Sequence, residues 1–295
     1  MATILQPNAL QGVNILITGA SSGIGRAAAI GCAQAGADSV ILFARSTDKL
    51  KETANSISDS GCKTKVLTIS CDVRDAKAVY GAVQKSLNDS GVKQIDVLIN
   101  NAGLAIGAPA TFSDLKLEDI DTMVDTNLKG MLYMTHAVLN CSSSGGRSMM
   151  ERKTGTILNI TSTTALEVPP FPGECIYHTT KASQEGFTNS LRTELQGTNI
   201  RVLVLRPGVV ADTTFHKQRV GHRKDEYDTF MAGFEPLLSE DVAEQIVWVL
   251  AQCNRKERVA IKALDVVPSA QRMLYVIDKD WNERNGVKDM KMEDS

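Results

Sequence analysis

Tyr177 and Lys181 are the pair of side chains in this sequence whose spacing points most directly to chemistry. Residues four apart share one face of a helix, so the phenol and the ammonium group would lie side by side. A phenol with a pKa of roughly 10 exchanges protons poorly at neutral pH. A neighbouring ammonium group stabilises the phenolate and lowers that pKa. We therefore predict that Tyr177 is a general acid/base and that Lys181 tunes it.

A glycine-rich segment follows the first predicted strand and opens a helix. It contains Gly19, Ser21, Ser22, Gly23, Ile24 and Gly25. Glycines allow a tight turn and a close approach to a pyrophosphate, and the helix N-terminus offers unpaired N–H groups and a partial positive charge. The two serines add hydroxyl donors. The segment predicts a dinucleotide-binding loop.

The end of the second predicted strand carries Ala44, Arg45 and Ser46. A protein that binds NAD usually places an acidic residue there, which holds the ribose 2′-hydroxyl. A guanidinium group at that position suits a 2′-phosphate instead. We therefore predict NADP(H) as the cofactor. The alternative is that Arg45 is a solvated arginine at the end of a strand.

The elements that must position these residues alternate along the chain. Short apolar runs predict strands at residues 13–18, 39–44, 65–70, 95–100, 156–160 and 200–205. Apolar residues at three- and four-residue spacing predict helices at 24–35, 48–60, 76–87, 118–139 and 177–195. Strands that are apolar on both faces, with helices between them, require a covered parallel sheet. The fold class predicted is α/β, a single-domain Rossmann-type doubly wound parallel sheet with helices on both faces.

Composition excludes several other classes of protein. The 295 residues carry 32 Lys and Arg against 34 Asp and Glu, a net charge of −2, which gives no general attraction to nucleic acid or an anionic membrane. No apolar run approaches the roughly 20 residues of a membrane-spanning helix. The 6 cysteines and 4 histidines show no metal-ligand or disulfide spacing. We expect reduced thiols, no metal and a cytoplasmic location.

Several motifs together resemble the short-chain dehydrogenase/reductase family, from about residue 13 to residue 271. The glycine-rich segment resembles its cofactor motif, residues 100–103 (Asn-Asn-Ala-Gly) its fourth-strand motif, and residues 177–181 its Tyr-x-x-x-Lys. The resemblance implies a catalytic tetrad of Asn127, Ser162, Tyr177 and Lys181. In it Ser162 hydrogen-bonds the substrate oxygen, Asn127 anchors a water path to the lysine, and Lys181 also holds the nicotinamide ribose. Thr163 is an alternative hydroxyl to Ser162.

The resemblance also implies further cofactor contacts. Asp72 would contact the adenine, and a turn aspartate is the structural alternative. A Pro-Gly motif after the sixth strand would cover the nicotinamide. The additional cofactor-binding residues implied are Asp72, Val73, Asn101, Ala102, Gly103, Pro207, Gly208, Val210 and Thr213.

The C-terminal third resembles the NADP-dependent serine and 3-hydroxy acid dehydrogenase subgroup. Residues 236–244 and 263–271 carry this resemblance. It implies reversible hydride transfer between a secondary alcohol and a ketone, on a 3-hydroxy acid or serine-like substrate. Arg219 is then a candidate for binding the substrate carboxylate, and a solvent-exposed arginine is the alternative.

Two other functions stay open at this point. The proline-rich segment 167–174 lengthens the loop before Tyr177 and would suit a biosynthetic ketoreductase for a larger ketone. A non-catalytic NADP-binding interaction protein would keep the fold, but the intact tetrad argues against it.

The predicted domain organisation is one catalytic NADP(H)-binding domain, residues 1–277, followed by a charged tail at 278–295 that Trp281 could dock. Residues 1–12 form a short extension, and 212–235 a substrate lid. The small exposed segment 141–147 has no assigned role. We expect a small-molecule carbonyl or alcohol substrate, no nucleic acid or membrane partner, and a homodimer or homotetramer through helices 118–139 and 177–195.

Overall fold

The structure is a computed structural model that describes residues 8–88, 91–167, 172–254, 259–273 and 276–291. The strands are β1 (Asn14–Thr18), β2 (Ser39–Ala44), β3 (Lys65–Ser70), β4 (Val97–Asn100), β5 (Thr154–Ile160), β6 (Asn199–Pro207), β7 (Ala263–Val266), β8 (Gln271–Met273) and β9 (Val276–Ile277). The helices are α1 (Gly23–Gln34), α2 (Thr47–Asp59), α3 (Ala76–Asn88), α4 (Leu117–Met123), α5 (Gly130–Asn140), α6 (Met149–Arg152), α7 (Cys175–Glu194), α8 (Thr214–Arg219), α9 (Lys224–Met231), α10 (Ser239–Asn254) and α11 (Trp281–Asn285). Short 3-10 turns lie at Phe112–Asp114 and Thr163–Ala165.

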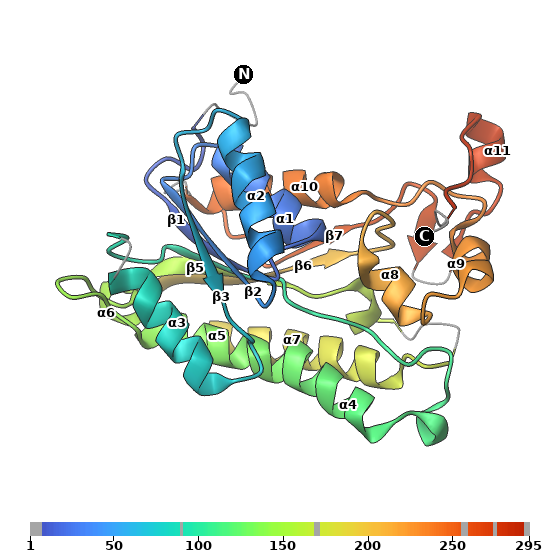
Figure 1. The fold of residues 1–295 in the computed structure, drawn as a ribbon, viewed down its shortest axis with the longest axis horizontal. Helices are drawn as coiled ribbons and strands as arrows, with labels where there is room; N and C mark the ends of the chain where they lie inside the picture. The colour runs from blue at the N-terminus through green and yellow to red at the C-terminus, as the bar shows by residue number, and fades with distance from the viewer. Residues whose placement is uncertain (1–7, 89–90, 168–171, 255–258, 274–275, 292–295) are drawn as a thin grey trace.

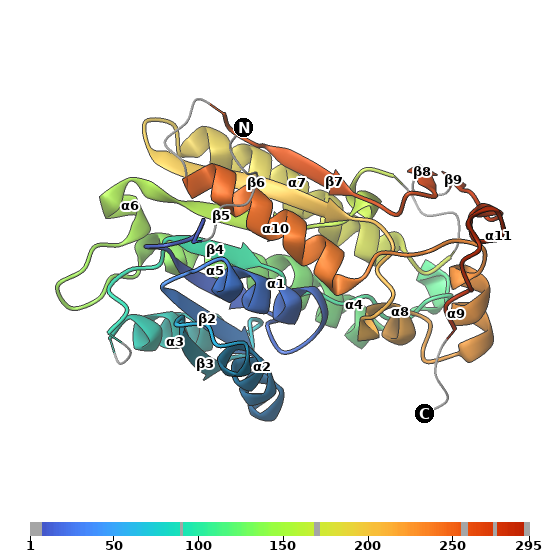
Figure 2. The same cartoon turned by 90° about the horizontal axis from the view of Figure 1, so that it is seen from above.

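Seven strands form one parallel sheet in the order β3-β2-β1-β4-β5-β6-β7. Helices α1, α2 and α10 cover one face, and α3, α5 and α7 cover the other (Figure 1). The view from above in Figure 2 shows α8, α9 and α11 gathered beyond the carboxyl ends of the strands. The predicted fold class is confirmed.

The alternation of β1 side chains explains why both faces are covered. Ile15 and Ile17 are buried in the apolar cluster that includes α1 and α10, whereas Leu16 is buried in the cluster that includes α3 and α5. Neighbouring side chains of a strand point to opposite faces, so an apolar run needs a helix layer on each side. β3 and β7 are the exceptions, since they are the edge strands and are partly exposed.

The sheet reverses its winding between β1 and β4, which lie side by side although β2 and β3 come between them in the chain. A crevice opens at such a point because the loops after the two strands leave in opposite directions. The glycine-rich segment follows β1, and residues 101–103 follow β4. The topology therefore brings these two motifs to one place.

Several elements differ from the sequence prediction, and the helices α6, α8, α9, α10 and α11 and the strands β7, β8 and β9 have no counterpart in it. The single helix expected at 118–139 is interrupted by a π-helical stretch, Val124–Lys129, between α4 and α5. β7 was not predicted, because its four residues are partly exposed and form no buried apolar run. The predicted segment 167–174 lies partly outside the described residues, at 168–171.

The described part of the tail packs against the region predicted as a lid. Trp281 contacts the apolar cluster that contains Tyr227, Met231 and Phe234. Asp289 accepts hydrogen bonds from the Gly233 N–H at 3.0 Å and from Asn282 Nδ2 at 2.9 Å. The tail therefore helps to hold α9. None of the described helices is both long enough and apolar enough to cross a membrane.

Candidate active site

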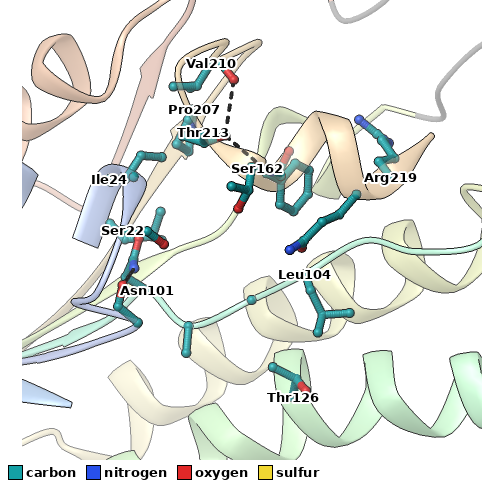
Figure 3. A pocket seen from close by; sticks show the side chains of 18 of the residues that line it. Ser22, Ile24, Asn101, Leu104, Thr126, Ser162, Pro207, Val210, Thr213 and Arg219 are labelled. Atoms are coloured by element: carbon teal, nitrogen blue, oxygen red, sulfur yellow. Dashed lines mark hydrogen bonds between the residues drawn. The ribbon is translucent and has the colours of Figure 1, made fainter. Parts of the chain in front are cut away.

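A cavity of about 810 Å³ lies at the carboxyl ends of the central strands. The predicted cofactor-binding residues that line it are Gly19, Ser21, Ser22, Gly23, Ile24, Arg45, Ser46, Asp72, Val73, Asn101, Ala102, Gly103, Tyr177, Lys181, Pro207, Gly208, Val210 and Thr213. Ser162 and Arg219 also line it, whereas Gly25 and Asn127 do not. Figure 3 shows Ser22 and Asn101 at one end and Arg219 at the other, with Ser162 between.

The loop after β1 has the geometry of a phosphate-binding turn. Gly19 and Gly23 have φ values of +66° and +51°, a region that side chains with a Cβ rarely adopt. A Cβ on Gly25 would lie 2.4 Å from the Gly19 carbonyl oxygen, so Gly25 lets the helix approach the loop from behind. The Ser22 hydroxyl makes no capping bond, and the first turn of α1 carries no acidic residue. The N-terminus of α1 thus fits an anionic pyrophosphate.

Thr18 and Asn101 join the loop after β1 to the loop after β4. Thr18 Oγ1 accepts from the Asn101 and Ala102 N–H groups, both at 3.0 Å, and Asn101 Nδ2 donates to the Thr18 carbonyl at 3.0 Å. These bonds fix the crevice at the switch point of the sheet. The role of Thr18 was not predicted, because its partners lie more than eighty residues away in the chain.

Two cationic side chains line the cavity near the end of β2. Arg45 and Lys49 both line it and both are exposed. Lys49 is in the first turn of α2, where its N–H donates to Ser46 Oγ at 3.4 Å. The pair fits a doubly charged 2′-phosphate better than a ribose hydroxyl. Lys49 was missed from the sequence, although its place four residues after Arg45 was a usable signal.

Asp72 also lines the cavity and forms an ion pair with Arg74. Its carboxylate accepts from Arg74 Nε at 3.0 Å and from an Arg74 terminal nitrogen at 2.6 Å. The hydrogen bond from Arg74 holds the pKa of Asp72 below its ordinary value. Asp72 therefore presents an ion pair rather than a lone carboxylate to the cavity.

Tyr177 is in the first turn of α7 and is buried, with 5% of its surface exposed. Ser162, which comes from the turn after β5, lines the cavity with it and acts to lower the pKa of its phenol. The alternative hydroxyl, Thr163 Oγ1, is buried without a hydrogen-bond partner among the described residues. The geometry therefore favours Ser162 over Thr163 as the hydroxyl that works with Tyr177.

Lys181 is buried one turn after Tyr177, but it does not tune the phenol as expected. Its Nζ donates to the Ile160 carbonyl at 3.0 Å and lies 5.8 Å from the centre of the Tyr177 ring. Burial raises the pKa of Tyr177 to about 12, although Arg219 and Ser162 act to lower it. Burial likewise lowers the pKa of Lys181 to about 8. The expected lowering of the Tyr177 pKa is wrong for this structure, since the effect of burial outweighs that of the positive charge of Arg219.

The shifted pKa of Lys181 predicts a pH-dependent effect on stability. Its folded-state pKa of about 8 is below the ordinary 10.5, so between these values the unfolded chain binds more protons and stability rises with pH. We expect the free energy of unfolding of the protein, relative to a Lys181→Met variant, to rise by about 2 kcal/mol from pH 7 to pH 9.5. Urea unfolding at a series of pH values measures this difference. The matched substitution at exposed Lys85 should show no such rise, and parallel curves for Lys181→Met would contradict the buried charge.

Asn127 is fully buried in the π-helical stretch, just behind the cavity wall. Its side chain accepts from the Leu104 N–H and donates to the Leu104 carbonyl, each at 2.8 Å, and donates to Thr180 Oγ1 at 3.1 Å. Its backbone carbonyl accepts from Gln184 Nε2. Asn127 therefore ties the loop after β4 to α7, and π-helical turns often mark functional sites.

The segment after β6 closes the cavity over the tetrad. Thr213 is the N-cap of α8, and its hydroxyl accepts from the Phe215 N–H at 3.3 Å. Phe215 places its ring 5.4 Å from the ring of Tyr177, centre to centre. His216 is buried beside it, and burial together with Arg219 lowers its pKa to about 3, so the imidazole is neutral. Neither aromatic residue was predicted, since nothing in their spacing separates them from core residues.

Arg219 is buried and ion-paired, which removes the solvent-exposed alternative. Its Nε and one terminal nitrogen donate to the two carboxylate oxygens of Glu174. The guanidinium carbon lies 5.3 Å from the centre of the Tyr177 ring. Glu174 was not predicted as its partner, because 45 residues separate them in the chain.

The comparisons with known proteins agree with this geometry. The sequence model described as short chain dehydrogenase matches residues 13–224. "Sulfoacetaldehyde reductase 2" of Chromohalobacter salexigens is 37% identical over 90% of this chain and 98% of its own. "NADP-dependent 3-hydroxy acid dehydrogenase" of Schizosaccharomyces pombe is 38% identical over 89% of this chain and 95% of its own.

A solved structure of similar fold is the closed form of serine dehydrogenase complexed with NADP+. It is 34% identical, covers 88% of this chain and 96% of its own, and superposes with a TM-score of 0.76. These matches confirm the predicted resemblance to serine and 3-hydroxy acid dehydrogenases. With the cofactor loop, the Tyr-x-x-x-Lys pair and the sheet order in place, the chain belongs to the short-chain dehydrogenase family.

Proposed function

We propose that the protein is an NADP-dependent oxidoreductase that interconverts a secondary alcohol and a ketone. The observation that carries this proposal is that Tyr177, Ser162 and Lys181 line the same cavity as the glycine-rich loop, Arg45 and Lys49. Three relatives or neighbours that bind or depend on NADP support the choice of cofactor.

The cavity fits this cofactor at both ends. The glycines of the loop let its backbone pack closely against Asn101 and Thr213, and the N-terminus of α1 attracts the negative charge of a pyrophosphate. Arg45 and Lys49 would hold the 2′-phosphate, and Lys181 the nicotinamide ribose. When bound, the nicotinamide ring supplies a hydride to the carbonyl carbon or accepts one from the alcohol.

The protein's own side chains would handle the substrate oxygen and its proton. In the reductive direction Tyr177 Oη donates a proton to the carbonyl oxygen as the C–H bond forms, and in the oxidative direction it accepts that proton. Ser162 Oγ donates a hydrogen bond to the same oxygen and fixes its position. Phe215 and Arg219 cover the Tyr177 ring and exclude water from it.

Two substrate groups have support. The names of the relatives, which refer to 3-hydroxy acids, serine and sulfoacetaldehyde, favour a small acidic substrate. A second cavity of about 420 Å³, which shares His216, Arg219 and Phe230 with the first, favours a larger ketone. The two cavities meet at Arg219, so the site could accept a substrate that extends past this residue.

The first experiment follows NADPH absorbance in both directions. NADP+ is supplied with serine and short 3-hydroxy acids, NADPH with small and bulky ketones, and each reaction is repeated with NAD(H). We expect turnover with NADP(H) and at least a tenfold lower efficiency with NAD(H). Tight NADPH binding without turnover of any alcohol or ketone would contradict the proposal and favour a binding protein.

We also propose a cytoplasmic homodimer or homotetramer built through α4, α5 and α7. The two amphipathic segments that we predicted for contact, 118–139 and 177–195, are the sequence feature that supports it. A monomer in light scattering would contradict it.

A further inference from the structure

The pairing of Arg219 with Glu174 bears on which substrates the site admits. Both side chains are buried, with 7% and 4% of their surfaces exposed. The two parallel hydrogen bonds between them use the fork of the guanidinium group in the way that it would bind a substrate carboxylate. The carboxylate of Glu174 therefore occupies the side of Arg219 that an acidic substrate would need.

The local structure directs Glu174 toward Arg219. Glu174 is the N-cap residue of α7, yet its side chain makes no capping hydrogen bond to that helix. Gly173, with φ of +93°, packs its backbone against Ala108, where a Cβ would lie 2.6 Å from the Ala108 Cα. This close approach fixes the chain just before Glu174. The ion pair is therefore set by the backbone, and not by a flexible surface side chain.

The charges around the substrate end do not offer a second site for an anion. His216 is neutral. The second cavity is lined by Asp225 and Glu226 as well as by Arg219, and Glu226 is itself paired with Arg223 at 2.8 Å. Among the described residues of that cavity, Arg219 is the sole cation, and Glu174 neutralises it. An incoming carboxylate would meet the like charges of Asp225 and Glu174 there, and among the described residues of that cavity no cation other than the paired Arg219.

We propose that Glu174 is a specificity-determining residue: by neutralising Arg219 it makes the substrate end of the cavity select an uncharged ketone or secondary alcohol over a carboxylate or sulfonate. This inference rests on the proposed oxidoreductase function and names its substrate class. The substrate would lie against Arg219 and the aromatic rings of Phe215 and Phe230, all of which line the main cavity.

The test uses one ketone in two charge states, acetoacetate and its methyl ester, with saturating NADPH. In the wild-type protein we expect kcat/KM to be at least about tenfold higher for the ester. Glu174→Gln keeps the shape of the side chain but removes its charge, and it should raise the acid-to-ester ratio by about tenfold or more, because Arg219 becomes available to a carboxylate. Glu194→Gln, at the exposed end of the same helix, is the matched control and should leave the ratio unchanged.

A double variant covers the case in which Glu174→Gln fails to fold with an unpaired buried arginine. Glu174→Gln with Arg219→Met removes both charges together and should keep the preference for the ester. A wild-type preference for acetoacetate would overturn the inference. So would an unchanged ratio in a folded Glu174→Gln variant, or a preference for the acid in the double variant.

A binding measurement separates this inference from the proposed function. 3-Hydroxybutanoate cannot be oxidised by NADPH-loaded protein, so any binding of it can be read as a thermal shift without turnover. We expect a shift in Glu174→Gln and none in the wild-type protein, and equal shifts would overturn the role of Glu174. Absence of turnover with either ketone, alongside the expected shift, would count against the proposed reaction but not against this selectivity.

Discussion

Replacing Tyr177 with phenylalanine is expected to lower kcat by at least about 100-fold while leaving the affinity for NADPH nearly unchanged. Positioned general acids typically contribute about 10²- to 10⁴-fold to a rate. The hydroxyl that this substitution removes is the group on which Ser162 acts. Phenylalanine keeps the ring that packs against Phe215 and Arg219, so the cavity should keep its shape.

The measurement combines steady-state turnover with NADPH fluorescence titration, because the two readouts separate proton transfer from cofactor binding. Tyr133→Phe is the matched control, since Tyr133 is on α5 and does not line the cavity. Unchanged turnover in Tyr177→Phe would refute the role of Tyr177 as the acid. A parallel loss of NADPH affinity would instead assign the tyrosine to binding.

The raised pKa of Tyr177 gives this experiment a second readout. Because burial holds the pKa at about 12, the phenol carries its proton throughout the neutral range in this structure. That protonation state suits the reductive direction, in which the tyrosine must donate. We expect ketone reduction to be faster than alcohol oxidation at pH 7, and we expect the rate of alcohol oxidation to increase as the pH rises.

The sequence predicts those parts of the site whose functional residues lie close together in the chain. Tyr177 and Lys181 are one helical turn apart, and Gly19, Gly23 and Gly25 occupy one turn between a strand and a helix. Local spacing alone places these groups, because a helix or a tight turn fixes their relative positions. The six predicted strands were found for the same reason, since an apolar run of that length has few other stable arrangements.

The parts that were missed depend on contacts between distant segments. The hydrogen bonds of Thr18 with Asn101, and of Arg219 with Glu174, join residues that are far apart in the chain. No local sequence pattern indicates either pair. The pKa of Tyr177 was misjudged because helical spacing reports the neighbouring charge but not the degree of burial, which here dominates. Substrate selection depends on this kind of packing, so motifs alone give the reaction class and leave the substrate open.

The cavity is electrostatically asymmetric, and this asymmetry leads to the second large effect. Arg45 and Lys49 at one end are exposed cations that line the cavity, whereas Arg219 at the other end is buried and neutralised by Glu174. An elongated anionic cofactor would therefore be oriented with its most charged group toward Arg45 and Lys49. The Arg219 end of the cavity, where Glu174 balances the charge, is left for the reacting carbonyl.

Removing both cations is expected to weaken NADPH binding by about 100-fold, since each exposed charge-assisted contact to a phosphate contributes roughly tenfold. The affinity for NADH, which lacks the 2′-phosphate, should change by less than about threefold. Titration of Arg45→Ala/Lys49→Ala with each nucleotide measures the two constants. Lys51→Ala is the matched control, because Lys51 lies on the same helix, is exposed, pairs with Asp48 and does not line the cavity.

The salt dependence of binding distinguishes a specific phosphate contact from a general positive field. In the wild-type protein the affinity for NADPH should fall with added salt more steeply than the affinity for NADH, because the 2′-phosphate adds charge at an exposed site. The double variant should lose that difference, since no cation remains at Arg45 or Lys49. Equal salt slopes in the wild-type protein, or an equal loss of NADH and NADPH affinity in the variant, would show that these residues do not read the 2′-phosphate. The choice of NADP would then have to depend on residues of the cavity other than Arg45 and Lys49.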